Sequence, residues 1–152
     1  MVKDFEIFEE ACSYLSQVIQ EFKETISAKI AALENADWFY DKGRTRTCRP
    51  DENGMKKRCK AGVSYSVKVE LRAEDAESIW QEFHTFFKDT AIGDTQRVSA
   101  NEEIGRYAFI AENVKGDRID CSIYLPGEWN IPQISLLLFV APRYRGEDIS
   151  VY

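Results

Sequence analysis

Between residues 4 and 34, apolar side chains recur at every third or fourth position, and this stripe limits the folds open to the chain more than any other feature. Its members are Phe5, Phe8, Cys12, Leu15, Ile19, Phe22, Ile26 and Leu33. The pattern predicts a long amphipathic helix within residues 1–34, about 45 Å in length at 1.5 Å per residue. We expect the stripe to face the chain's own core. The alternative is a homodimer in which part of the N-terminal helix pairs with a second copy.

A strict alternation of apolar and polar residues from Val63 to Leu71 predicts a strand with one buried face and one wet face. A second helix is expected from Ala73 to about Lys88, since acidic residues occupy its first turn and aromatic residues follow. Three further strands are expected at 106–111, 118–125 and 133–140, and the short loops between them predict antiparallel pairing. The last of these barely alternates, which indicates a central strand or one covered on both faces.

These elements predict the α+β class, with an antiparallel sheet of four to five strands. The long N-terminal helix and one crossover helix are expected to pack mainly on one face of this sheet. A length of 152 residues fits a single domain. Within residues 1–152 we expect a basic hairpin or arm at 42–60, a strand–helix–meander core at 61–141 and a tail at 142–152.

The charge is distributed unevenly along the chain. The formal net charge is −6, but residues 42–60 carry eight basic and two acidic residues, whereas the segments before and after each carry −6. The basic segment either neutralises the protein's own acids or attracts an acidic protein partner. A nucleic-acid or anionic-lipid partner ranks below an acidic protein, because the acidic body would repel a polyanion and no aromatic residues are interleaved with the basic ones. The basic residues predicted to bind a partner are Arg44, Arg46, Lys56, Lys57 and Arg58.

Four cysteines are present, and they fall into two classes. Cys12 and Cys121 lie on apolar faces and are expected to be free and buried. Cys48 and Cys59 flank a strong turn signal, Pro50–Gly54, so a hairpin can bring them together. A disulfide between them and a pair of free thiols are both open at this stage, and a disulfide would imply an oxidising compartment. With no C-x-x-C motif and one histidine, the sequence predicts no metal site.

The start of the chain bears on its location. Acidic residues stand where a signal peptide has its apolar region, and no apolar run reaches the roughly 18 residues of a membrane-spanning helix. Taken from Met1, the sequence predicts a cytoplasmic protein. If Met1 replaces a removed leader, the cell envelope is expected instead.

The order of features between Tyr65 and Leu138 resembles the LppA-like lipoproteins of actinobacteria. The strand Tyr65–Leu71 is followed by Asp75-Ala76-x-x-x-Trp80 and then by two strands around the turn Lys115-Gly116-Asp117. This resemblance implies a small envelope-anchored domain without known catalysis, and it would suit a Cys48–Cys59 disulfide. The chain differs from that family in lacking the leader with its lipid-bearing cysteine and a cysteine at the end of the last strand.

No catalytic motif is found, so we expect a protein that is not an enzyme and holds no cofactor. The leading interpretation is a protein-interaction domain of the immunity or antitoxin type, which binds and masks a partner protein. Trp129, in a Pro-Gly loop, is a candidate aromatic anchor for that partner, unless it folds back onto the sheet. The alternative is an extracytoplasmic protein or lipoprotein domain of the bacterial cell envelope with a Cys48–Cys59 disulfide.

Overall fold

The computed structural model describes residues 6–41, 46–50, 52, 54, 56–128 and 130–146. Two helices, α1 (Phe8–Lys29) and α2 (Ala73–Phe87), pack against one seven-stranded sheet, and the fold is α+β as predicted. Two short 3-10 turns are also present, η1 (Ala31–Leu33) and η2 (Glu102–Ile104). The strands are β1 (Phe39–Asp41), β2 (Thr47–Pro50), β3 (Lys57–Val67), β4 (Asp94–Val98), β5 (Arg106–Glu112), β6 (Arg118–Tyr124) and β7 (Gln133–Tyr144).

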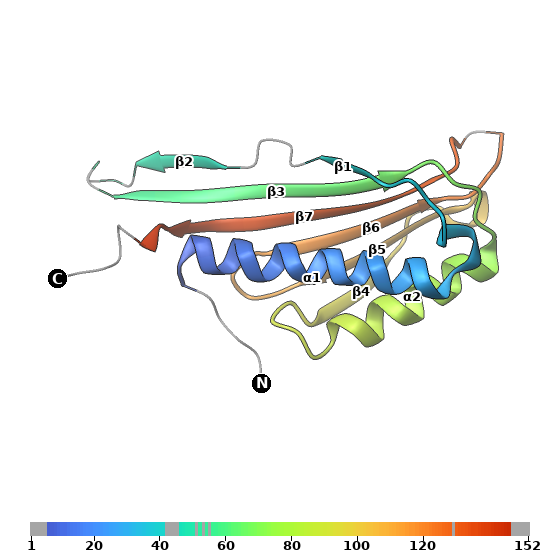
Figure 1. Cartoon of the computed structure of the whole chain (residues 1–152), viewed down its shortest axis with the longest axis horizontal. Coiled ribbons are helices and arrows are strands. Elements are labelled where there is room, and N and C mark those ends of the chain that lie inside the picture. Colours follow the sequence, from blue (N-terminus) through green and yellow to red (C-terminus); the bar gives the residue numbers. More distant parts are fainter. Residues whose placement is uncertain are drawn as a thin grey trace.

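The sheet is antiparallel throughout, with the strand order β1-β3-β7-β6-β5-β4. Both β1 and β2 pair with β3, and they follow one another along its outer edge (Figure 1). The two helices lie on the same face of the sheet (Figure 1). No described element covers the other face, which we call the open face.

The apolar stripe of α1 lies in the protein's own core, as expected. Seven α1 side chains are buried, and they meet the helix-facing side chains of β3, β5, β6 and β7. Phe22 lies at the centre of an aromatic cluster with Phe83, Phe86 and Phe87 of the α2 region. Dimerisation through α1 stays a prediction, and it would have to use a face other than this buried stripe.

The long N-terminal helix is shorter than the sequence predicted. It ends at Lys29, because Ile30 has an extended backbone, and η1 follows. Ile30 and Leu33 are nevertheless buried. A 3-10 turn also places residues i and i+3 on one side, so the apolar spacing continues after the α-helix has ended.

The strand count of four to five was too low. The sequence pattern missed the three-residue strand β1 and the polar strand β4 at the opposite edge. An edge strand with little buried surface needs no apolar alternation. In β4 the inward residue Arg97 forms ion pairs with Glu77 and Glu102. A charged residue thus occupies a position at which an alternating strand pattern would have an apolar one.

Two boundaries also differ from the prediction. The basic hairpin and the first core strand share one continuous strand, β3, so the described part of the basic segment belongs to the sheet. At the other end, β7 continues through Pro142 and Arg143 to Tyr144, into the expected tail. Pairing of Cys59 with Arg143 and of Arg58 with Tyr144 extends the β3–β7 ladder into the hairpin.

β7 is central in the sheet but is not covered on both faces. It lies between β3 and β6, and its alternate residues Ile134, Leu136 and Leu138 are fully buried under the helices. Its other apolar residues reach the open face, where Leu137 is 48% exposed and Phe139 is 40% exposed. The weak alternation of this strand therefore reflects an apolar open face.

Candidate binding site on the basic hairpin

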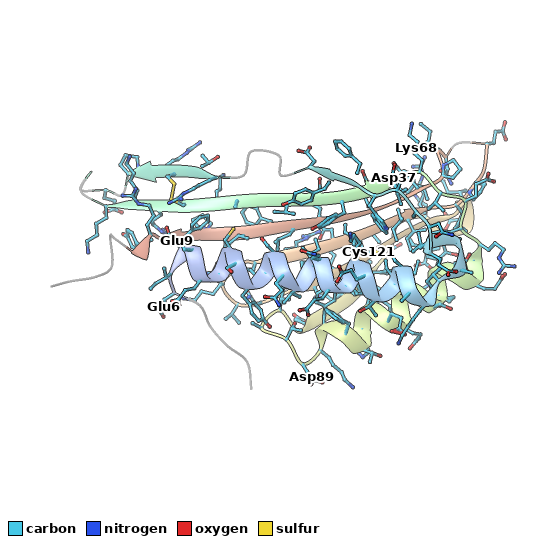
Figure 2. All side chains as sticks on the ribbon, in the orientation of Figure 1. Glu6, Glu9, Asp37, Lys68, Asp89 and Cys121 are labelled. Carbon is cyan, nitrogen blue, oxygen red and sulfur yellow. A yellow bond between two sulfur atoms is a disulfide. The ribbon has the colours of Figure 1, made fainter. Side chains whose placement is uncertain are left out.

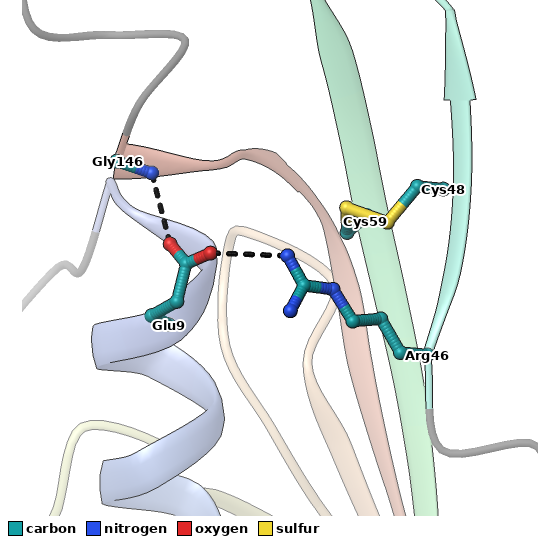
Figure 3. Close-up of a disulfide and its surroundings, with 5 residues drawn as sticks. All are labelled: Glu9, Arg46, Cys48, Cys59 and Gly146. Atoms are coloured by element: carbon teal, nitrogen blue, oxygen red, sulfur yellow. Dashed lines mark hydrogen bonds and ion pairs between the residues drawn. A yellow bond between two sulfur atoms is a disulfide. The ribbon is translucent and has the colours of Figure 1, made fainter.

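The hairpin of β2 and β3 is closed by a disulfide. Cys48 and Cys59 are direct cross-strand partners, with Cα atoms 4.1 Å apart, and their sulfur atoms are bonded (Figure 3). Directly opposed residues of an antiparallel pair come this close at positions that exchange no backbone hydrogen bonds. Cys59 is fully buried, whereas Cys48 is half-buried. The bond therefore fixes the short strand β2 to the sheet.

A carboxylate on α1 holds the start of β2 and the end of β7 together. Glu9, at the N-terminal end of α1 (Figure 2), accepts a hydrogen bond from the backbone N–H of Gly146 at 2.9 Å and one from Arg46 at 3.2 Å (Figure 3). The bond from Gly146, with a smaller contribution from Arg46, lowers the pKa of Glu9 despite partial burial. Arg46 also lies 5.4 Å from the ring centroid of Phe8. Its positive charge thus neutralises an acid of the protein itself.

On the open face, β2, β3 and β7 form a cavity of about 660 Å³, which we call the hairpin pocket. It is lined by Thr47, Arg49, Pro50, Glu52, Arg58, Lys60, Pro142 and Tyr144. A second, smaller cavity shares Thr47, Arg49 and Lys60 with it and extends to Phe139. Volumes in this range are typical of sites for small ligands.

The cations of the hairpin pocket have few partners within the protein. Arg49 and Arg58 are direct cross-strand neighbours, and like charges in that position repel each other. Arg58 donates a hydrogen bond to the Pro142 carbonyl at 3.3 Å and lies 5.7 Å from the ring centroid of Tyr144. Among the described residues, neither Arg49 nor Lys60 forms a side-chain hydrogen bond or ion pair. The pocket therefore carries uncompensated positive charge.

The structure separates the residues that the sequence predicted to bind a partner. Arg58 lines the hairpin pocket, and Lys56 lies beside it, 6.0 Å from the Tyr144 ring centroid. Lys57 is exposed on the same hairpin. Arg46 points instead toward α1, and the predictions for Arg44 and Trp129 lie outside the described residues.

Sequence reasoning missed Arg49, Lys60 and Tyr144, which also line the pocket. The signal for the two basic residues lay in the pairing of the cysteines. If Cys48 pairs with Cys59, then Arg49 pairs with Arg58, and Lys60 lies two positions after Arg58 on the same strand. All three side chains are then expected on one face of the hairpin. Tyr144 had no such signal, because it lies in the expected tail. Only the extension of β7 brings it opposite Arg58.

A buried ion pair lies next to the hairpin, on β7. Arg143 donates two hydrogen bonds to Asp117, at 2.7 and 2.6 Å, and the two side chains are 4% and 1% exposed. Asp117 also accepts bonds from Asn113 and from the backbone N–H of Ala141. Burial alone would raise the pKa of Asp117, but these hydrogen bonds outweigh it and the pKa is lowered. The pair holds the turn between β5 and β6 to the end of β7. This end of β7 borders the pocket.

The chemistry-bearing residues elsewhere in the described chain are scattered. His84 is exposed, with its Nδ1 2.6 Å from the Thr95 hydroxyl and its ring against Trp80. Burial raises the pKa of the Cys121 thiol, which lies between α1 and the sheet (Figure 2). In the ranges that the structure describes, no three metal-ligating side chains cluster, and neither helix is apolar enough over a sufficient length to cross a membrane.

Comparison with known proteins gives a structural match only. No protein-family profile matches the sequence, and no curated protein matches it significantly. A crystal structure from Mycobacterium tuberculosis, described as the candidate lipoprotein LppA, aligns with a TM-score of 0.63 at 11% identity, over 96% of this chain and 83% of that one. The chain has an LppA-like fold. The resemblance predicted from the sequence is thus confirmed at the level of the fold.

A second structure shares this fold. It is that of a DUF4853 family protein from Actinomyces odontolyticus, with a TM-score of 0.55 at 11% identity, over 95% of this chain and 72% of that one. The LppA-like match and this match both span nearly the whole chain, so the similarity includes the helices and both sides of the sheet rather than a single motif.

Proposed function

We propose that the chain is a non-catalytic domain of the bacterial cell envelope that works outside the cytoplasm. The observation that carries this proposal is the Cys48–Cys59 disulfide, because bonds of this kind persist in oxidising compartments and are rare in the cytosol. The likeness in fold to the candidate lipoprotein LppA supports the same location. The disulfide joins the short edge strand β2 to β3, and such a bond is stable outside the reducing cytosol.

A thiol count on unreduced protein tests the location. Protein prepared from the native host, with thiols blocked at lysis, should show two free thiols per chain after unfolding, those of Cys12 and Cys121. Before unfolding, a thiol reagent should modify Cys12 first, because Cys121 is fully buried and its raised pKa disfavours the reactive thiolate. Four free thiols in the unfolded, unreduced protein would contradict the envelope proposal.

The arrangement of side chains in the described residues supports the non-catalytic part of this proposal. His84 is the single histidine of the chain, and it contacts Thr95 and Trp80 rather than a thiol or a carboxylate among the described residues. The described cysteines outside the disulfide are one buried thiol and one half-buried thiol on the helix. A general base and a nucleophile in mutual reach, which covalent catalysis needs, are not found among these groups.

The interpretation as an immunity or antitoxin protein gains no support from the comparisons, since neither structural neighbour is described as either. Binding of an acidic protein partner by the hairpin stays a prediction. If it is right, the affinity for that partner should fall as salt is added and should fall again when Lys56 and Lys57 are changed to Glu. An affinity that is unaffected by salt and by these changes would exclude the hairpin as the binding surface.

A further inference from the structure

We propose that the hairpin pocket binds the phosphate group of an organic phosphate, with its organic part against the apolar lining residues Tyr144, Pro50 and Pro142. This goes beyond the envelope location proposed above and does not depend on it. The proposal starts from the charge of the pocket. Arg49, Arg58 and Lys60 line it against one carboxylate, that of Glu52, so the lining carries a net positive charge.

The cross-strand position of the two arginines supports an anionic ligand. Because Arg49 and Arg58 face each other across the β2–β3 pair, the ligand-free protein bears a repulsion that an anion between them would relieve. Guanidinium groups bind phosphate through two parallel hydrogen bonds, so two arginines in the lining of one pocket suit a phosphate ligand. Lys60 and the Thr47 hydroxyl, also in the lining, supply further donors.

The size and the remaining walls of the pocket favour an organic phosphate over inorganic phosphate. A cavity of about 660 Å³ is much larger than one phosphate ion. Pro50, Pro142 and Tyr144 give it an apolar side, and the Tyr144 ring is already held by Arg58 and Lys56. These three side chains give a glycerol, sugar or similar group apolar surface to contact within the pocket.

Phosphate is favoured over the carboxylates of an acidic protein because of the shape of the site. Arg49, Arg58 and Lys60 line one cavity formed by three strands, whereas a protein partner is usually bound by charges spread over a wider, flatter surface. Arg46, which would have widened the basic surface, is bound to Glu9 on the helix side. Three cations of the described hairpin, Arg49, Arg58 and Lys60, thus lie around one hollow.

The test uses sn-glycerol 3-phosphate with the oxidised, full-length chain, measured by titration calorimetry at low ionic strength. We expect saturable one-to-one binding. The variant Arg49→Gln/Arg58→Gln should weaken it about tenfold or more, because each arginine supplies charge-assisted hydrogen bonds. Arg118→Gln is the matched control, since Arg118 also lies on a strand of the sheet but is paired with Asp120, and it should bind like wild type.

If the double variant folds poorly, melting temperatures of the single variants with and without ligand provide a second test. In ligand-free buffer, Arg49→Gln alone should leave the melting temperature unchanged or raise it, because it removes a repulsive pair at an exposed position. Glycerol 3-phosphate should raise the melting temperature of wild type and of Arg118→Gln by similar amounts, and that of Arg49→Gln by less. A loss of stability in Arg49→Gln without ligand would contradict the repulsion on which the proposal rests.

A vesicle experiment distinguishes the two sources of such a phosphate. If the ligand is a lipid headgroup, the chain should bind phosphatidylcholine vesicles only when they contain phosphatidylglycerol, and glycerol 3-phosphate should compete. If the ligand is a free organic phosphate, the soluble probe should bind and neither vesicle should. Both results support a phosphate site, provided that Arg49→Gln/Arg58→Gln weakens the binding about tenfold or more.

Three results would overturn the proposal. They are no saturable binding of glycerol 3-phosphate, equal binding by wild type and the arginine double variant, and tighter binding of poly-glutamate than of the phosphate probe. The last result would assign the pocket to an acidic polypeptide. Each of them leaves the envelope proposal intact, because that proposal is tested by the thiol count.

Discussion

Replacing Asp117 by Asn is expected to lower the free energy of unfolding by about 3–5 kcal/mol, the range found when one member of a buried ion pair is removed. The substitution leaves the Arg143 guanidinium, in a side chain 4% exposed, without an opposite charge. Asn can retain part of the hydrogen bonding but not the charge. Urea unfolding of both proteins measures the loss, and the melting temperature should fall by roughly 10 °C.

The matched control is Asp120→Asn, which removes the partner of Arg118 from a partly exposed pair. There the solvent screens the charges, and we expect a change of less than about 1 kcal/mol. The double variant Asp117→Asn/Arg143→Met should recover much of the lost stability, because it leaves no unpaired buried charge. Equal losses for Asp117→Asn and Asp120→Asn would contradict the role of burial.

The Asp117 contribution also depends on pH in a defined direction. The pKa of Asp117 is lower in the folded protein than in the unfolded chain, so the unfolded state takes up the proton first as the pH falls. The stabilisation is therefore complete above the unfolded pKa of about 3.9 and is lost as the pH falls toward the folded pKa. The stability difference between wild type and Asp117→Asn should accordingly narrow below about pH 4.

Removal of the disulfide is expected to have the second largest effect. The bond closes a loop between residues separated by 11 positions, and the chain-entropy estimate for a loop of this size is about 2–3 kcal/mol. Cys48→Ala/Cys59→Ala should lower the free energy of unfolding by that amount. Amide hydrogen exchange should also become faster in β2, because this strand pairs only with β3 among the described strands.

Reduction provides an independent form of the same experiment. Wild type treated with dithiothreitol should unfold at the same urea concentration as Cys48→Ala/Cys59→Ala, and Cys12→Ala should unfold close to oxidised wild type. An unchanged midpoint after complete reduction would show that backbone pairing alone holds β2. The phosphate affinity of the double cysteine variant should fall as well, since β2 carries Arg49.

The architecture was predictable where burial imposed a period on the sequence. The stripe of α1 and the alternation in β3 both have one buried face, so their type could be read directly. β4 could not be recognised, because its inward Arg97 is satisfied by Glu77 and Glu102 on other elements. The sequence shows residue types, but it does not show that an ion pair will replace an apolar contact.

The site was less predictable than the fold, for a related reason. The run of basic residues was evident, but its division into two roles depends on distant partners. Arg46 is bound to Glu9, 37 positions earlier in the chain, whereas Arg49 faces Arg58 across the hairpin. Tyr144 joins them through the β3–β7 ladder alone. Local sequence carries no signal of contacts made over such separations.

The position of β7 has a consequence for how the protein folds. The strand that joins the two halves of the sheet is the last strand in the described chain, so β1, β2 and β3 on one side and β4, β5 and β6 on the other cannot be united until it is available. The β3–β7 pairing also joins segments that lie about half the chain apart, from Val67 with Ile134 to Arg58 with Tyr144, and such contacts slow folding. During synthesis the two parts of the sheet should therefore remain unjoined until residues 133–144 have emerged from the ribosome.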